Sequence, residues 1–300
     1  MKRLSIVIPT FERYPFLVWT IDRLKRDLPE AELVVSDNAS SDFTRWPDGY
    51  LTDHDQYLCQ SSNIGAFPNM LAALSAAKGQ YAVYCADDDY LLLEQIAVAI
   101  AYLDAHPEVA AYCAPCEIYD EVNQKTFWNA FKVGQERAYG QADAMEFFNF
   151  IISDHIWPEH IVYRTPVPLH PRTRAYWAFA DLVDILAVGA IYFSNTPFYR
   201  NLLVHPVGTR VQLGNEQCLT DFDQYRGGLE VLAHGLFGAE LPYKARHQIQ
   251  EMIGSFLCSR METAAKLYAR QGHIEEATML LQRISIATPS REVYALPTRI

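Results

Sequence analysis

The sequence predicts an α/β fold in which a mixed sheet is flanked by helices and followed by a helical C-terminal segment. Two observations predict it. Over the first hundred of the 300 residues, short β-branched runs alternate with longer segments that carry apolar residues at helical spacing, the pattern of βαβ units. Beyond Glu216 the spacing is helical almost throughout, with breaks at glycine-containing segments.

The α/β part begins with a β-branched strand over residues 4–8, and Pro15 then lies where the first turn of a helix tolerates a missing N–H. Further strands are predicted over residues 31–36, 56–59 and 81–86, and as one long apolar run over residues 109–119. A helix opens at Pro68 and stops at Gly79, and another covers residues 92–105.

The second half of the chain is less regular. Residues 123–180 are rich in aromatic side chains, which suit either a sugar-binding surface or the core of a second layer. The C-terminal helices are predicted over residues 219–237, 243–271 and 274–284. Self-association into a homo-oligomer, docking on a membrane surface and packing on the α/β part are the three roles that this helical segment could have.

Composition excludes several classes of protein. With 25 basic and 36 acidic residues, the net charge of −11 argues against a nucleic-acid partner, which needs clustered Lys and Arg. The six cysteines lack the dense spacing of a disulfide scaffold, and Cys113 and Cys116 have no second pair to complete a zinc site. Without a signal peptide or an apolar run long enough to span a bilayer, we expect a cytoplasmic protein whose membrane contact is peripheral, at the inner face.

Polar clusters follow three of the predicted strands: Pro9-Thr10, Asp37-Asn38 and Asp87-Asp88-Asp89. Open α/β sheets bind ligands beyond the carboxyl ends of their strands, so these clusters should converge, although each alone could be a turn or a helix cap. Three adjacent aspartates repel one another unless a cation offsets them. Carboxylate oxygens suit Mg²⁺ or Mn²⁺; the alternative is a solvated acidic turn that caps the next helix.

Four motifs occur in a fixed order, and together they resemble the family 2 glycosyltransferases of the GT-A fold. They are Ile8-Pro9-Thr10-Phe11, then Asp37-Asn38-Ala39-Ser40-Ser41-Asp42, then Asn63-Ile64-Gly65 with Asn69, and finally Tyr84-Cys85-Ala86-Asp87-Asp88-Asp89. Two positions depart from the family pattern. Ala86 stands where many members have the first acid of D-x-D-D, and Glu12 stands where Asn is common.

The resemblance implies roles for residues at the matching positions. Thr10 and Asp37 would contact the base of a nucleotide-sugar donor, Asp87 its ribose, and Asp88 or Asp89 the metal on its diphosphate. The donor-binding residues expected on this basis are Pro9, Thr10, Phe11, Glu12, Arg13, Asp37, Asn63, Gly65, Asn69, Asp87 and Arg210, the last as a partner for a phosphate oxygen. His205 falls where related enzymes often present a histidine to the metal, although a lone histidine is more often structural.

The segment from Tyr176 to Leu182 resembles the part of the family that carries the catalytic base just before a helix. Inverting transfer needs one carboxylate to take the proton of the acceptor, and Asp181 is the residue expected to do so, with Asp184 as the fallback. An acid that merely stabilises the start of a helix is the alternative for Asp181.

The resemblance as a whole implies an inverting glycosyltransferase that uses Mn²⁺ or Mg²⁺ and a nucleoside-diphosphate sugar, with UDP favoured. The acceptor would be a glycan or a lipid-linked sugar in surface polysaccharide synthesis. Residues 1–215 would form the catalytic domain, with a donor half over 1–120 and an acceptor half over 121–215, and residues 216–300 the helical segment. The rivals are a sugar nucleotidyltransferase, which should carry a glycine-rich basic phosphate loop near its first strand, and a non-catalytic sugar-binding protein.

Overall fold

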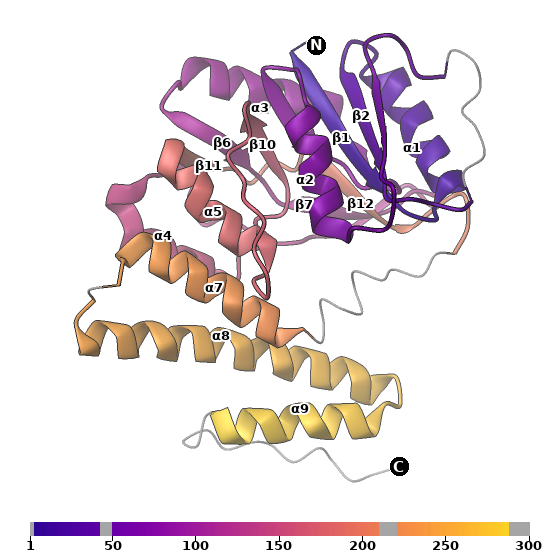
Figure 1. The fold of residues 1–300 in the computed structure, drawn as a ribbon. Coiled ribbons are helices and arrows are strands. Elements are labelled where there is room, and N and C mark those ends of the chain that lie inside the picture. The colour runs from indigo at the N-terminus through magenta and orange to yellow at the C-terminus, as the bar shows by residue number, and fades with distance from the viewer. Residues whose placement is uncertain (1–2, 43–49, 210–220, 240, 288–300) are drawn as a thin grey trace.

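The computed structural model describes residues 3–42, 50–209, 221–239 and 241–287 (Figure 1). The strands are β1 (Leu4–Thr10), β2 (Glu32–Asp37), β3 (Gln56–Cys59), β4 (Tyr81–Tyr84), β5 (Tyr90–Leu91), β6 (Val109–Cys113), β7 (Cys116–Asp120), β8 (Lys125–Asn129), β9 (Arg137–Tyr139), β10 (Ile161–Arg164), β11 (Ala190–Phe193) and β12 (Tyr199–Val204). The helices are α1 (Tyr14–Asp27), α2 (Ala66–Ala76), α3 (Leu93–Ala105), α4 (Ala144–Ser153), α5 (Trp177–Val188), α7 (Phe222–Phe237), α8 (Tyr243–Arg270) and α9 (Ile274–Ala287), with a 3₁₀ turn over Gln141–Asp143.

The main sheet has eight strands in the order β3-β2-β1-β4-β10-β6-β11-β9. β1, β2, β3 and β4 are parallel, so their carboxyl ends lie at one edge, and Thr10 stands opposite Asp37 in the register of β1 and β2. β10 runs antiparallel to both β4 and β6, which makes the sheet mixed. The predicted α/β fold and the first four strands are therefore confirmed.

The prediction of a single strand over residues 109–119 is wrong. β6 ends at Cys113 in the main sheet, and β7 begins at Cys116 in a second sheet of four strands, ordered β5-β12-β7-β8. Pro115 stands between them. Because proline has no N–H to donate and restricts the residue before it, the chain leaves one ladder and joins another at this point. The second sheet brings β12 beneath the loop that carries the aspartates.

Two apolar cores cover the two faces of the main sheet. On β1, Ile6 and Ile8 face the core that α1 and α3 complete, whereas Val7 faces the core that α2 and α5 complete. Alternate residues of a strand point to opposite faces, which explains why a continuous apolar run suits a strand covered on both sides. The polar residues that follow each strand are thereby left at the sheet edge.

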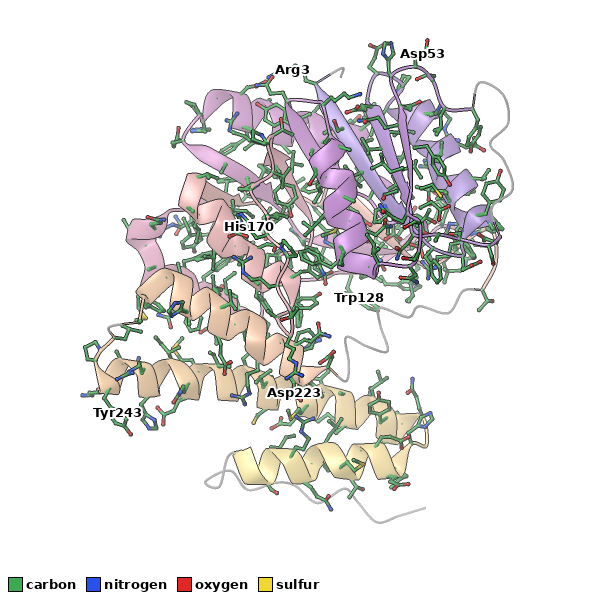
Figure 2. The ribbon with its side chains drawn as sticks, viewed as in Figure 1. Arg3, Asp53, Trp128, His170, Asp223 and Tyr243 are labelled. Atoms are coloured by element: carbon green, nitrogen blue, oxygen red, sulfur yellow. The ribbon has the colours of Figure 1, made fainter. Side chains whose placement is uncertain are left out.

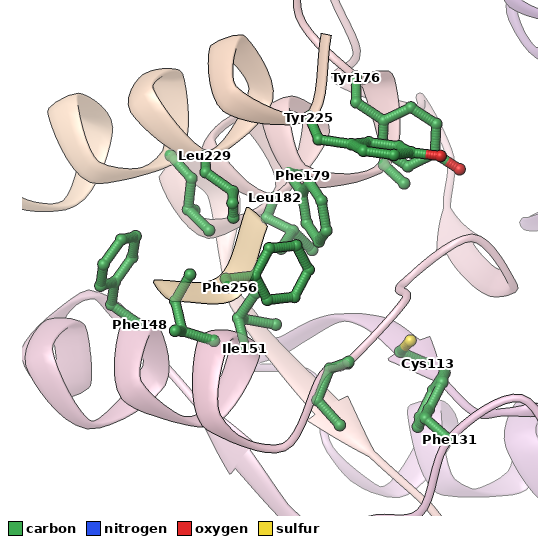
Figure 3. Packing of buried hydrophobic residues seen from close by; sticks show 14 of the residues in the cluster. Cys113, Phe131, Phe148, Ile151, Tyr176, Phe179, Leu182, Tyr225, Leu229 and Phe256 are labelled. Atoms are coloured by element: carbon green, nitrogen blue, oxygen red, sulfur yellow. The ribbon is translucent and has the colours of Figure 1, made fainter. Parts of the chain in front are cut away.

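The C-terminal helices extend the second of these cores in successive layers, with α7 on α5, α8 beyond α7 and α9 beyond α8 (Figure 1). Tyr176, just before α5, and Phe179 within it lie close to Tyr225 of α7 and Phe256 of α8 (Figure 3). The predicted helices are confirmed, α7 starting three residues later than expected, at Phe222. None of the described helices is both long and apolar enough to cross a bilayer.

Glycine allows the close approach of α7. A Cβ on Gly227 would come within 2.0 Å of the Arg174 carbonyl oxygen, and one on Gly228 within 2.7 Å of the Tyr176 carbonyl oxygen. The backbone N–H of Tyr176 also donates to the Gln224 carbonyl of α7 at 2.8 Å. The helical segment thus fixes the chain that leads into α5. The predicted domain boundary near residue 215 lies outside the described residues.

Candidate functional site

The structure brings the three strand-end clusters together. The Thr10 hydroxyl at the end of β1 donates to Asp87 Oδ2 at 2.7 Å, and the Asn38 backbone N–H donates to the Thr10 carbonyl at 2.9 Å. Thr10, Asp37 and Asp87 are each at most 6% exposed. Three polar side chains from separate segments are therefore buried together at one edge of the sheet. If each cluster were only a turn or a helix cap, there would be no reason for the three to be buried together.

Arg13 lies against two of the aspartates. Its Nη1 is 3.2 Å from Asp87 Oδ1 and 2.6 Å from Asp88 Oδ2. Burial, and then the charge of Asp88, raise the pKa of Asp87 to about 6 despite Arg13 and the Thr10 hydroxyl. Two carboxylates are thus crowded into a site of low polarity, where positive charge stabilises their ionised forms.

A divalent cation fits this donor set. Among the described residues no three His, Cys, Asp or Glu side chains form a ready-made metal cluster. Mg²⁺ and Mn²⁺ are nevertheless usually held by one or two carboxylates together with substrate phosphates, so Asp88 with a diphosphate would suffice. The charge crowding of Asp87 and Asp88 is what such an ion would relieve.

Asp89 is engaged elsewhere. Its Oδ2 accepts hydrogen bonds from the Tyr199 hydroxyl at 2.9 Å and from Asn201 Nδ2 at 3.0 Å, and its Oδ1 accepts from the Leu202 backbone N–H at 2.8 Å. All three donors belong to β12. Asp89 therefore fastens the aspartate loop to the second sheet, and of the two metal ligands predicted within the triplet, Asp88 is the one that faces Arg13.

A shallow hollow opens beside Thr10 and Asp37, lined by Thr10, Tyr14, Leu17, Asp37, Ser40, Asp42 and Tyr57. The Asp37 carboxylate accepts from the Tyr57 hydroxyl at 2.7 Å and from the Ser40 backbone N–H at 2.9 Å. An aromatic ring, an aliphatic wall and a fixed carboxylate are features that orient a small planar ring.

Glu12 joins the two loops that border this hollow. Its carboxylate accepts from the backbone N–H groups of Ser41 and Asp42, and hydrogen bonding from Ser41 lowers the pKa of Glu12. Its own N–H donates to the Ser40 hydroxyl at 2.8 Å. Glu12 adopts a φ of 54°, a left-handed conformation that non-glycine residues rarely hold without such support. Of its predicted neighbours, Pro9 is partly buried in β1 and Phe11 is exposed.

The residues of the third motif, Asn63, Gly65 and Asn69, make hydrogen bonds that fix the backbone around the end of β2. Asn63 Oδ1 accepts from Asn38 Nδ2 and from the Gly65 backbone N–H, both at 2.9 Å. Gly65 has a φ of 95°, which favours glycine, and it precedes α2. Asn69 is buried and makes two hydrogen bonds of 2.7 Å with Ser36, one with its hydroxyl and one with its carbonyl. Asn63 thus stabilises the loops at the surface, and Asn69 stabilises the end of β2 from within.

His205 lies just beyond β12, buried against α1. Its ring centroid is 4.9 Å from that of Phe16 and 4.6 Å from that of Trp19, and its Nδ1 accepts the Val207 backbone N–H at 3.1 Å. The structure thus places it between the end of β12 and α1. The other predicted residue of this segment, Arg210, lies outside the described residues.

The two predicted catalytic acids differ sharply. α5 begins at Trp177, so Asp181 lies in its second turn, and the expectation that Asp181 precedes the helix is wrong. The preceding aromatic and alanine residues pack into the core, and that burial extends the helix toward the N-terminus. Asp181 is 1% exposed, has no hydrogen-bond partner, and burial followed by the charge of Asp184 raises its pKa to about 8.

Asp184 is paired. Arg172 donates to its two oxygens at 2.7 and 2.6 Å, and the His170 backbone N–H donates at 3.0 Å. Burial opposes ionisation, but the hydrogen bonds from Arg172 outweigh it and lower the pKa of Asp184. This bidentate pair holds the 170–174 segment against α5, which is a structural role.

Sequence reasoning missed Glu159. Its carboxylate accepts a hydrogen bond from the Tyr176 hydroxyl, and it lies two residues before β10. Burial raises the pKa of Glu159 to about 7. The available signal was an acid among the aromatic residues of the Trp157-Pro158-Glu159-His160 segment, in the part of the chain expected to offer an acceptor surface.

A wider groove, with about 850 Å³ of empty space, lies between α2 and the start of α7. Its lining residues are Phe67, Arg172, Arg174, Ala175, Trp177, Asp221, Asp223 and Gln224. The rings of Phe67 and Trp177 stack at 5.9 Å, and Trp177 also lies edge-on to Tyr84 at the end of β4. Asp223, which is labelled in Figure 2, lines the groove from the first turn of α7. The groove therefore lies between the α/β part of the chain and the C-terminal helices.

A family profile described as Glycosyl transferase family 2 matches residues 5–165, just over half of the chain. Over 97 residues the chain is 33% identical to the GalNAc(5)-diNAcBac-PP-undecaprenol beta-1,3-glucosyltransferase of Campylobacter jejuni, a match that covers 31% of each protein. The matched stretches of the curated relatives span about a third of their length, 37% in the first of them.

Solved structures share the fold over most of the chain. The crystal structure of S. aureus TarS 1–349 in complex with UDP superposes with a TM-score of 0.54 at 15% identity, covering 99% of this chain and 94% of that one. The mannosyltransferase PcManGT from Pyrobaculum calidifontis, solved in complex with GDP-Man and Mn²⁺, gives 0.53 at 16% identity, covering 95% of this chain and 80% of that one. The matches establish a GT-A-like fold.

Proposed function

This chain belongs to glycosyl transferase family 2, and we propose that it transfers a sugar from a nucleoside-diphosphate sugar to a hydroxyl of a glycan or lipid-linked acceptor, with inversion. A UDP-sugar is the favoured donor. The observation that carries the proposal is the buried contact of Thr10 with Asp87 at the edge where Asp37 also ends its strand. A nucleotide-binding site at that edge is what the topology of an open α/β sheet favours.

In the proposed complex the base enters the hollow beside Tyr57, where Asp37 accepts hydrogen bonds and Thr10 lies at the rim. Asp87 meets the ribose, and Asp88 meets the diphosphate through a divalent cation. Mn²⁺ or Mg²⁺ bound by Asp88, with His205 as a further candidate ligand, would supply positive charge for the leaving diphosphate. Arg13 supports this charge distribution, since it already lies within 3.2 Å of both carboxylates.

The acceptor, in this proposal, lies in the groove between α2 and α7. Trp177 and Phe67 offer aromatic faces to the apolar side of a sugar ring, and Arg174 and Gln224 offer hydrogen-bond donors. The Campylobacter relative, by its name, acts on an undecaprenol-linked glycan, which supports a lipid-linked acceptor. The setting we favour is surface polysaccharide assembly at the cytoplasmic face of the membrane.

Donor binding and turnover test the proposal in one experiment. Thermal unfolding is followed with UDP, GDP, ADP and CDP, each with and without Mn²⁺, and release of the diphosphate is then measured from the sugar form of the best ligand. A ligand at about one hundred times its dissociation constant stabilises the protein by about 2.7 kcal/mol. We expect one diphosphate to stabilise it only with Mn²⁺.

The same assay separates the alternatives. Release of pyrophosphate from a nucleoside triphosphate and a sugar phosphate would identify a nucleotidyltransferase. Sugar binding without turnover of any donor would identify a non-catalytic protein. If the nucleoside diphosphate bound and its sugar form were turned over at the full rate without Mn²⁺, the proposed role of Asp88 would be contradicted. The proposed sugar transfer would not be.

A further inference from the structure

Arg13 binds the same carboxylate oxygen that a divalent cation would use. Its Nη1 lies 2.6 Å from Asp88 Oδ2 and 3.2 Å from Asp87 Oδ1. Mg²⁺ lies about 2.1 Å from an oxygen that coordinates it, so an ion on Asp88 Oδ2 would come within roughly 5 Å of Nη1. Two positive groups that close repel each other, and more strongly in a buried site than in water. Binding of the ion and of the guanidinium to Asp88 Oδ2 is therefore competitive.

The carboxylates of the other two aspartates are already engaged. Asp87 accepts from the Thr10 hydroxyl through Oδ2 and from Arg13 through Oδ1. Asp89 accepts three hydrogen bonds from β12, two on Oδ2 and one on Oδ1. Both side chains are buried. An ion that binds to the triplet thus has to compete with Arg13.

The backbone of Arg13 is fixed, whereas its side chain reaches the surface. Its carbonyl accepts the backbone N–H groups of Phe16 and Leu17, both at 3.0 Å, at the start of α1. The preceding residue, Glu12, is held by the hydrogen bonds that its carboxylate accepts. The side chain of Arg13 is 23% exposed, so a change of rotamer can move the guanidinium while the strand and the helix stay in place.

The guanidinium has a second partner in the proposed complex. A donor diphosphate brings negative charge beside carboxylates that already crowd one another. A planar guanidinium binds phosphate oxygens through paired hydrogen bonds, and a divalent cation bridges the phosphates to a carboxylate. If the ion takes Asp88 and Arg13 turns to the phosphates, each positive group faces negative oxygens of its own.

We propose that Arg13 is the counter-ion of Asp88 in the free protein, and that it moves to the donor diphosphate when a divalent cation replaces it on Asp88. This inference rests on the proposed function and adds that the metal site depends on the donor. The free protein should bind Mn²⁺ weakly, and the diphosphate and Mn²⁺ should strengthen each other's binding by the same factor. Arg13 thus prevents the aspartates from holding a cation before the donor arrives.

The test measures Mn²⁺ binding without turnover. The electron paramagnetic resonance signal of free Mn²⁺ is followed during titration with the protein, first alone and then with saturating UDP or the diphosphate that the thermal screen selects. In the wild type we expect the diphosphate to raise the affinity for Mn²⁺ by about 100-fold. Arg13→Met should bind Mn²⁺ alone about tenfold more tightly than the wild type does, because the repulsion is gone.

Binding of the diphosphate tests the other half of the exchange. With saturating Mn²⁺, calorimetry should find that Arg13→Met binds UDP about ten- to one-hundredfold more weakly, since the charge-assisted hydrogen bonds to the phosphates are lost. Because Mn²⁺ already binds to the free variant, the enhancement of its affinity by UDP should fall by about tenfold.

Further variants make the result specific. Arg26→Met removes the same charge from α1, but Arg26 is exposed and pairs with Asp27, so Mn²⁺ binding should stay as in the wild type. Arg13→Met combined with Asp88→Asn should lose the gained affinity, which would exclude adventitious binding to other acids of this acidic protein. Arg13→Lys keeps the charge and should bind Mn²⁺ alone about as weakly as the wild type. If Arg13→Met does not fold, Arg13→Gln removes the charge and retains a hydrogen-bond donor.

The inference is overturned if the folded variant, Arg13→Met or Arg13→Gln, binds Mn²⁺ alone within about threefold of the wild type. It is also overturned if the wild type binds Mn²⁺ equally well with and without the diphosphate. Diphosphate binding that needs Mn²⁺ would still support the proposed donor site in the first case. A protein that binds no nucleoside diphosphate, with or without Mn²⁺, overturns the proposed function and this inference with it, so the two failures are distinguishable in the same titrations.

Discussion

The strand-end edge that carries Thr10, Asp37 and Asp87 and the seam between α5 and α7 are held together by different forces. At the edge, buried polar groups satisfy one another: the Thr10 hydroxyl binds Asp87, and Tyr57 binds Asp37. At the seam, apolar rings meet across glycines that allow the two backbones to approach (Figure 3). The first arrangement keeps charge available for a ligand, and the second keeps a backbone in position.

This difference predicts whether a substitution in each region should lower activity or stability. Charge removed from the edge leaves the apolar cores intact, so activity should fall while stability is kept. A methyl group added at the seam strains the backbone, so stability should fall, and activity only through the displacement of Tyr176. The following changes test this division, from the largest expected effect to the smallest.

Asp88→Asn should have the largest effect, on activity alone. Loss of the carboxylate that faces the diphosphate is expected to lower kcat by about 10³-fold, equivalent to about 4 kcal/mol of transition-state stabilisation. The midpoint of urea unfolding should stay near that of the wild type. Asp53→Asn, at an exposed loop residue labelled in Figure 2, is the control and should change neither quantity. Full activity in Asp88→Asn would contradict the assignment of this region to donor chemistry.

Gly227→Ala should lower the free energy of unfolding by about 3 kcal/mol, because the new methyl group would come within 2.0 Å of the Arg174 carbonyl oxygen. Gly254→Ala in α8 is the matched control. Nothing lies within 4 Å of a Cβ at that position, so alanine should raise the free energy of unfolding by about 0.5 to 1 kcal/mol. Equal effects of the two substitutions in urea titrations would show that α7 does not depend on close approach.

Arg172→Met should lower the free energy of unfolding by about 2 kcal/mol, because it leaves Asp184 ionised and only 9% exposed without its bidentate partner. Asp184→Asn alone should cost less, and the double variant should recover much of the loss, as in a double-mutant cycle. Strict additivity of the two losses would indicate that the pair contributes no coupling.

Asp181→Asn should change the pH dependence of stability. The folded protein keeps a proton on Asp181 up to about pH 8, whereas the unfolded chain releases it above about 3.8, so ionisation favours the unfolded state in this window. The free energy of unfolding of the wild type should therefore fall relative to that of Asp181→Asn by about 1 kcal/mol between pH 6 and pH 7. Parallel curves for the two proteins would mean that Asp181 is ionised in the fold.

The convergence of the three polar clusters could be predicted from sequence because each cluster directly follows a strand. Three parallel strands bring Thr10, Asp37 and Asp87 together without any knowledge of distant contacts. The hydrogen bonds of Asp89 to β12 could not be predicted in this way. They join residues more than a hundred positions apart, and local spacing carries no signal for such a contact.

The other errors share a cause. The run over residues 109–119 has the apolar pattern of one strand, and only tertiary pairing shows that the chain changes sheets at Pro115. Glu159 was missed because no strand was predicted over residues 161–164, so nothing in the sequence placed the segment before β10 at the edge of the sheet. Asp181 was placed before α5 because the family segment that Tyr176 to Leu182 resembles carries its base just before a helix, whereas here the helix already begins at Trp177.

The antiparallel course of β10 has an evolutionary consequence. The polar clusters of the proposed donor site follow β1, β2 and β4, whereas the loop opposite them precedes β10, so the two lie in separate stretches of the sequence. Under the proposed function, exchanges over residues 154–160 should leave the strand-end clusters that are proposed to bind the nucleotide unchanged. Chimeras that swap only this loop and the α7 helix that supports it are the natural route to new linkages on this scaffold.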